Sequence, residues 1–172
     1  MRKTGFLAAA LLAACLASTA TAAEKTLLDP LIGEWNVSPP GGVTAFIERF
    51  SFGPSQGYVW VQVALIQPSG EEHLHFEGMS VWNAATGRFD YLYAVEPGSG
   101  VQEKGEIYAG DGGVIVRDVT LTAADGSTAT FRQTFRDLGD GRFETALMRK
   151  SADGWQPTFP GSERLIMTRR TT

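Results

Sequence analysis

The sequence predicts an all-β protein: a single antiparallel up-and-down β-barrel of about ten strands, with a short N-terminal helix closing one end. Segments rich in β-branched and aromatic residues recur along the chain, as in residues 58–66 and 114–116. Glycine-rich turn signals separate them, and Asp-Gly, whose residues tolerate positive φ, occurs four times. No helical pattern lies between these segments, so neighbouring strands are expected to pair antiparallel.

The elements are expected in a simple order. Residues 24–32 place their apolar side chains on one side of about two helical turns, which Pro30 and Gly33 keep short. Candidate strands follow at residues 34–38, 43–52, 58–66, 72–82, 88–95, 101–108, 114–122, 127–137, 142–150 and 163–170. A meander of this length has two free edges unless it closes into a barrel. The connections are too short for the Greek-key crossings of a sandwich, the alternative architecture.

The first residues have the features of a secretory signal peptide. A basic start, an apolar run over residues 6–17 and an Ala-x-Ala site at residues 20–22 predict cleavage after residue 22 or 23. The signal peptide is therefore assigned to residues 1–23 and a single barrel domain to residues 24–172, giving a periplasmic or secreted product. The alternative is a lipoprotein, because Leu-Ala-Ala-Cys ending at Cys15 resembles a lipobox; only then would a membrane be a partner.

Charge and cysteine content narrow the possible partners and chemistry. The chain has 15 basic and 19 acidic residues, a formal charge of −4, and it becomes more acidic when Arg2 and Lys3 leave with the signal peptide. Phosphate binding needs a concentrated basic face, so no nucleic-acid partner is expected. Cys15 is the single cysteine, so the barrel domain has no disulfide and no thiol chemistry.

Several short motifs carry a resemblance to a known superfamily. They are Gly33-Glu34-Trp35 after the apolar turn, Tyr58-Val59, Thr86-Gly87-Arg88-Phe89, and Asp125-Gly126-Ser127 before Arg132. Together they resemble the calycins (lipocalins, fatty-acid-binding proteins and nitrobindins), and among these a family of secreted bacterial lipocalin-like proteins of uncharacterised function. The resemblance implies that Gly33 and Trp35 close one end of the barrel. It also implies a basic residue of the last strand across Trp35, for which Arg169 is preferred over Arg164 and Arg170.

Large aromatic residues share strand faces with isolated charges, which suggests a ligand cavity as readily as a solid core. The candidate ligand-binding residues are Trp60, Tyr91, Tyr93, Arg117 and Arg132. Arg117 interrupts an otherwise apolar strand face, and an inward arginine suits a carboxylate or a similar anionic head group. A barrel of this size can hold a small ligand. The leading hypothesis is therefore an exported protein that binds an apolar or amphipathic small molecule.

Metal, haem and catalytic sites are less favoured. His73 and His75 are expected on one face of a strand with Glu77, which makes these three weak metal candidates. No histidine follows His75, whereas the nitrobindin resemblance would need a late histidine for haem, so no cofactor is expected. No catalytic set is evident, and the enzyme alternative is a hydrolase or isomerase that uses His75 or a carboxylate inside the cavity. A structural or assembly role at the cell envelope is the third hypothesis.

Overall fold

The computed structural model describes residues 26–54 and 56–171. The predicted signal peptide, residues 1–23, and the lipobox residue Cys15 lie outside the described residues. No helix within the described part of the chain is long and apolar enough to cross a membrane.

Almost every element is a β-strand, as predicted. The strands are β1 (Gly33–Ser38), β2 (Phe46–Phe52), β3 (Tyr58–Ile66), β4 (Glu72–Asn83), β5 (Arg88–Val95), β6 (Val101–Ala109), β7 (Ile115–Thr122), β8 (Thr128–Asp137), β9 (Arg142–Ser151), β10 (Gly154–Pro157) and β11 (Leu165–Arg169). Two single 3₁₀ turns, η1 (Asp29–Leu31) and η2 (Asp111–Gly113), are the other regular elements described.

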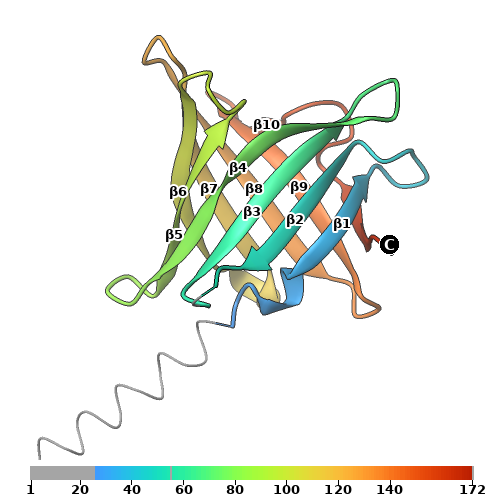
Figure 1. Cartoon of the computed structure of the whole chain (residues 1–172), viewed down its shortest axis with the longest axis horizontal. Helices are drawn as coiled ribbons and strands as arrows, with labels where there is room; N and C mark the ends of the chain where they lie inside the picture. Colours follow the sequence, from blue (N-terminus) through green and yellow to red (C-terminus); the bar gives the residue numbers. More distant parts are fainter. Residues whose placement is uncertain (1–25, 55, 172) are drawn as a thin grey trace, which may run out of the picture.

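The strands close into a barrel (Figure 1). Consecutive strands from β1 to β9 pair antiparallel, and β11 joins β9 to β1 and so completes a ring of ten strands. The short β10 pairs with the far half of β9, beyond the part that β11 covers. Closure leaves the ring without free edges, and it confirms the predicted antiparallel barrel.

The predicted two-turn helix over residues 24–32 is not seen. In the described part of this segment η1 is one 3₁₀ turn, in which Leu31 N donates to Leu28 O at 3.0 Å and Ile32 N donates to Asp29 O at 3.2 Å. An α-helix would need a hydrogen bond from residue 30 to the carbonyl of Thr26, and Pro30 has no N–H to donate. Strand β1 then begins at Gly33, whose φ of 135° ends any helical path.

The end of the barrel next to η1 is filled by Trp35. Its side chain is fully buried, its Nε1 donates to Leu31 O at 2.6 Å, and its ring meets the edge of Phe143 at 5.4 Å between centroids. The guanidinium of Arg169 lies 4.5 Å from the centre of the Trp35 ring and donates to Ile32 O at 2.9 Å. A side chain at Gly33 would collide with Arg169, since its Cβ would lie 2.5 Å from Nη1. These contacts tie the first and last strands of the ring together.

A β-bulge in β4 sets which residues of that strand face the interior. Val63 of β3 pairs with Phe76, but the next residue, Ala64, pairs with Leu74, so His75 is the extra residue. The bulge shifts the inside–outside alternation by one residue. The expectation that Glu77 shares a face with His73 and His75 is therefore wrong, because Glu77 lies on the outer face and accepts a hydrogen bond from Gln62 at 3.0 Å.

Candidate functional site

A cavity of about 330 Å³ lies inside the barrel towards the end opposite η1. Most of its wall is apolar and comes from Phe46, Val63, Leu65, Phe76, Val119, Leu121, Phe131, Leu147 and Phe159. Leu65 and Leu121 lie near the ends of β3 and β7, and Phe46 begins β2, so these residues surround the open end. The polar groups that line it include Glu48, His75, Glu103, Arg117 and Gln133. This combination of apolar walls and few polar groups is typical of a small-molecule site.

A buried polar network forms the inner end of this cavity. Arg117 of β7 lies directly opposite Gln133 of β8 in the strand register, and its Nη2 donates to Gln133 Oε1. Glu48 of β2 reaches the pair across the interior, with its Oε1 3.3 Å from Arg117 Nη1 and its Oε2 accepting from Gln133 Nε2 at 3.2 Å. Gln133 Nε2 also lies within 3.2 Å of Thr145 Oγ1. All four side chains are buried.

The network holds an ion pair. Burial raises the pKa of Glu48, while the charge of Arg117 and the hydrogen bond from Gln133 act in the opposite direction. Burial is the largest single influence on the pKa of Arg117 and would lower it, but the charge of Glu48 together with Tyr93, Tyr91 and Glu103 outweighs burial and raises that pKa. Because an arginine in a protein keeps its proton, an ionised Glu48 is the form that neutralises the buried charge. The predicted anion contact of Arg117 is thus made by the protein itself.

The hydrogen bonding of this ion pair is incomplete. Among the described residues, Glu48 Oε1 and the Nε and Nη1 atoms of Arg117 are buried and have no hydrogen-bond partner. The hydroxyl of Tyr91 is also buried and has no hydrogen-bond partner among the described residues. Buried polar groups in folded proteins are normally hydrogen-bonded, and orphaned ones need an explanation. Here the ion pair lies at the inner end of the cavity, and its unpaired atoms are themselves closed to solvent.

Glu103 is a second carboxyl group in the cavity wall. It is 8% exposed, and it lies opposite Tyr93 in the pairing of β5 with β6. Burial raises the pKa of Glu103 to about 7, although the charge of Arg117 acts to lower it. A carboxyl group with such a pKa can exchange a proton near neutral pH.

Glu103 is expected to make stability depend on pH. Its pKa rises from 4.5 to about 7 on folding, so its stabilising contribution is complete below the unfolded value and is lost as the pH rises through the folded one. The Glu103→Gln variant should therefore gain about 2–3 kcal/mol relative to the wild type between about pH 5 and pH 8. Urea unfolding of both proteins across this range measures the difference, and a constant difference would contradict the buried position of Glu103.

The predicted ligand-binding residues divide between the two faces of the barrel. Tyr91, Tyr93 and Arg117 are inside, with exposed fractions of 4%, 1% and 7%. The two tyrosine rings have room because glycines lie opposite them: Gly105 pairs with Tyr91 and Gly78 with Tyr93. A Cβ at Gly78 would lie 2.5 Å from the Tyr93 ring.

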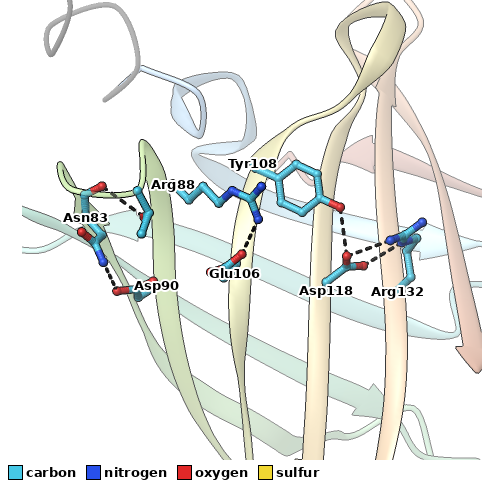
Figure 2. A network of polar contacts seen from close by, with 8 residues as sticks. Asn83, Arg88, Asp90, Glu106, Tyr108, Asp118 and Arg132 are labelled. Carbon is cyan, nitrogen blue, oxygen red and sulfur yellow. Dashed lines mark hydrogen bonds and ion pairs between the residues drawn. The ribbon is translucent and has the colours of Figure 1, made fainter.

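Trp60 is a correction to that set, and Arg132 is at the cavity but engaged by other residues. Trp60 alternates with the buried Val59 and Val61, so the period of the strand places it on the outer face. Arg132 borders the cavity, but its guanidinium forms two hydrogen bonds with Asp118, at 2.6 and 2.8 Å, and lies 4.7 Å from the Trp155 ring centre. Figure 2 shows the contact between Arg132 and Asp118, which belongs to a row of polar contacts across neighbouring strands. Trp60 is therefore not among the residues that line the cavity, whereas Arg132 lines it with its guanidinium engaged by Asp118.

The two histidines share one carboxylate near the open end. His73 Nε2 lies 2.8 Å from Glu96 Oε2, and His75 Nδ1 contacts Glu96 Oε1. Within residues 26–54 and 56–171 no cluster of three or more histidine, cysteine, aspartate or glutamate side chains is arranged to hold a metal ion. Of the pair, His75 is the one that lines the cavity.

Sequence reasoning missed Glu48, which the structure places at the centre of the site. A signal was present, because Glu48 stands between Phe46 and Phe50 at alternate positions of one strand. The pattern places a charged side chain on an apolar strand face. Arg117 has the same kind of position on its own strand. Pairing the two required knowing that β2 faces β7 and β8 across the closed barrel.

A second cleft of about 590 Å³ lies at the opposite end, beside η1. It is lined by Leu27, Pro30, Trp82, Arg88 and Tyr108, among others. The charge of Arg88 is already paired with Glu106. The first cavity is the stronger candidate because its walls are mostly apolar and a buried ion pair lies at its inner end.

No protein-family model matches the chain, and no curated protein matches it.

Proposed function

We propose that this is an exported binding protein that holds an apolar or amphipathic small molecule in the cavity at the open end of the barrel. The observation that carries the proposal is a cavity of about 330 Å³ with mostly apolar walls and a few charged and polar side chains among its lining residues. Apolar walls favour a hydrocarbon portion of the ligand, and a few fixed polar groups orient its head. The export part rests on the signal peptide predicted at residues 1–23.

A cavity-filling variant tests this function. Leu121→Trp should fill the cavity and weaken the binding of octanol, measured by titration calorimetry, by about tenfold or more. Leu92→Trp is the matched control, because Leu92 is 53% exposed on the outer face and the same substitution there leaves the cavity open. Native mass spectrometry of protein prepared from the periplasm without detergent should also find a bound small molecule. Equal octanol affinity in both variants would overturn the proposal.

The enzyme alternative is favoured by one specific observation. The cavity brings His75 together with Glu103 and Arg117, and the pKa of Glu103 is raised to about 7. A carboxylate of this kind suits a general base that removes a proton next to a carbonyl group, as in an isomerase.

Proton exchange measures that activity without knowledge of the natural substrate. The protein should speed the exchange of the α-protons of methyl hexyl ketone in deuterium oxide, followed by proton NMR, and Glu103→Gln should abolish the acceleration. Glu106→Gln is the matched control, since Glu106 lies on the outer face of the same strand and pairs with Arg88. An acceleration that survives in Glu103→Gln, or its absence from the wild type, would reject this alternative.

A further inference from the structure

We propose that the cavity selects an amphipathic ligand whose head group is a protonated primary amine, and that the carboxylate of Glu103 on β6 holds this head. This inference rests on the proposed binding function and names the chemical class of its ligand. It follows from the partners of the charged side chains in the cavity wall and from the surface that Glu103 leaves open.

The other charged groups of the wall already have partners. The charged or titratable side chains that line the cavity are those of Glu48, His75, Glu103, Arg117 and Arg132. Glu48 and Arg117 form an ion pair with each other, and Arg132 is paired with Asp118. His75 contacts the carboxylate of Glu96. Both arginines of the wall are therefore neutralised by carboxylates other than Glu103.

Glu103 is open to a ligand. Within residues 26–54 and 56–171 its carboxyl group forms no hydrogen bond and no ion pair, although it feels the charge of Arg117. Unlike the unpaired atoms of the Glu48–Arg117 pair, its carboxyl oxygens are not closed to solvent. The side chain lies on the inward face of β6 and is 8% exposed. A molecule in the cavity can therefore reach this group without breaking an existing contact.

A carboxylate in this situation favours a cationic partner. Burial raises the pKa of Glu103 to about 7, even though the charge of Arg117 acts to lower it, so the ionised form lacks a sufficient counter-charge. An ammonium group supplies that charge and donates hydrogen bonds to the carboxylate, and charge-assisted hydrogen bonds are the strong ones. Glu48 lies 3.3 Å from Arg117 and neutralises it, which reduces the repulsion between this arginine and the ammonium.

An anionic head finds no comparable partner in the wall. Its charge would meet the carboxylate of Glu103, and the guanidinium groups of Arg117 and Arg132 are already engaged by Glu48 and Asp118. Like charges placed together at a binding site disfavour the wrong ligand.

The apolar wall begins next to Glu103. Leu121 lies directly opposite Glu103 in the pairing of β6 with β7, and it lines the cavity together with Leu65, near the end of β3. An alkyl chain attached to the amine would pack against these side chains. The arrangement therefore fits a long-chain primary amine, with its head at Glu103 and its chain along the leucines.

Three probes of equal chain length test the selection: octylamine, octanol and octanoate, each titrated calorimetrically at pH 8. At this pH Glu103 is mostly ionised, and an alkyl amine is protonated, as is a lysine side chain with its pKa of about 10.4. Octylamine should bind about tenfold or more tightly than octanol, and octanoate more weakly than octanol. If octanol binds at least as tightly as octylamine, or more weakly than octanoate, the inference is overturned and the proposed function stands. Failure of all three compounds to bind rejects the proposed function itself.

Variants at two glutamates of β6 assign the cause. Glu103→Gln removes the charge, so it should lower the ratio of octylamine affinity to octanol affinity about tenfold while octanol still binds. Glu106→Gln is the matched control and should keep the wild-type ratio, because Glu106 lies on the outer face and pairs with Arg88. A ratio that falls in both variants, or in neither, would overturn the role of Glu103.

The pH dependence of the ratio separates Glu103 from its neighbours. Glu103 takes up a proton as the pH falls through about 7, so the preference for octylamine should shrink between pH 8 and pH 5.5. The other titratable or charged groups around the cavity are Tyr91 and Tyr93 of β5, Arg117 of β7, Arg132 of β8, Glu48 of β2 and His75 of β4. All of these remain in Glu103→Gln, so its ratio should vary clearly less with pH than that of the wild type. Equal pH dependence in the two proteins would overturn the assignment to Glu103.

Discussion

Replacing Arg117 with methionine is expected to lower the free energy of unfolding by about 3–5 kcal/mol, the range measured when one partner of a buried ion pair is removed. Arg117 is 7% exposed and Glu48 is fully buried, so the substitution leaves a carboxylate without its counter-charge inside the barrel. Gln133 Oε1 also loses the N–H of Arg117 as its donor. Equilibrium unfolding in urea measures the change.

Two controls separate the buried charge from other effects of the substitution. Adding Glu48→Gln to Arg117→Met removes the uncompensated carboxylate and should recover much of the lost stability. Arg132→Met on the neighbouring strand breaks an ion pair whose side chains are about one third exposed, and it should cost only about 0–1 kcal/mol through that pair. Similar losses for Arg117→Met and Arg132→Met would show that the interior pair is not isolated from solvent.

Trp35→Ala is expected to destabilise the protein by about 3–5 kcal/mol, as for other fully buried aromatic residues. The substitution removes the edge contact with Phe143, the hydrogen bond to Leu31 O and the ring beneath Arg169. It also leaves a cavity next to η1 that the closed barrel cannot easily collapse. Thermal and urea unfolding measure the loss.

The same variant distinguishes an architectural residue from a binding residue. Trp35 does not line the candidate cavity, so the folded variant should bind octanol with nearly the wild-type affinity. Trp60→Ala on the outer face is the matched substitution and should cost clearly less, because it leaves no interior cavity. A stable Trp35→Ala protein that no longer binds octanol would instead place Trp35 in the ligand site.

The segment at residues 24–32 was expected to form a helix, but its described part forms one 3₁₀ turn. The apolar spacing predicts a buried segment, and Leu28 and Leu31 are 1% and 0% exposed. The error concerned backbone hydrogen bonding: Pro30 cannot donate within the segment, and one 3₁₀ turn buries the same side chains. The spacing of apolar residues predicts which side chains are buried, but it does not predict whether the backbone forms an α-helix or a 3₁₀ turn.

The β-bulge at His75 had no comparable signal in the sequence. A strand read with an unbroken period of two puts His73, His75 and Glu77 on one face. The register of β4 on β3 shifts at Val63 and Ala64 and sends Glu77 outward. Such a shift depends on how two strands fit inside a closed ring, so it follows from the pairing partner as much as from the strand itself.

The sequence by itself determined the antiparallel barrel, because turn residues and a period of two are local properties that each segment carries alone. It also named Arg117, Tyr91 and Tyr93 among the candidate ligand-binding residues, but it did not separate these inward side chains from the outward Trp60. Only the tertiary structure decided that Glu48 forms an ion pair with Arg117 across the barrel. The two residues are 69 positions apart in the chain (residue 48 against residue 117). That contact depends on closure, which brings β2 opposite β7 and β8 and places the ion pair at the inner end of the cavity.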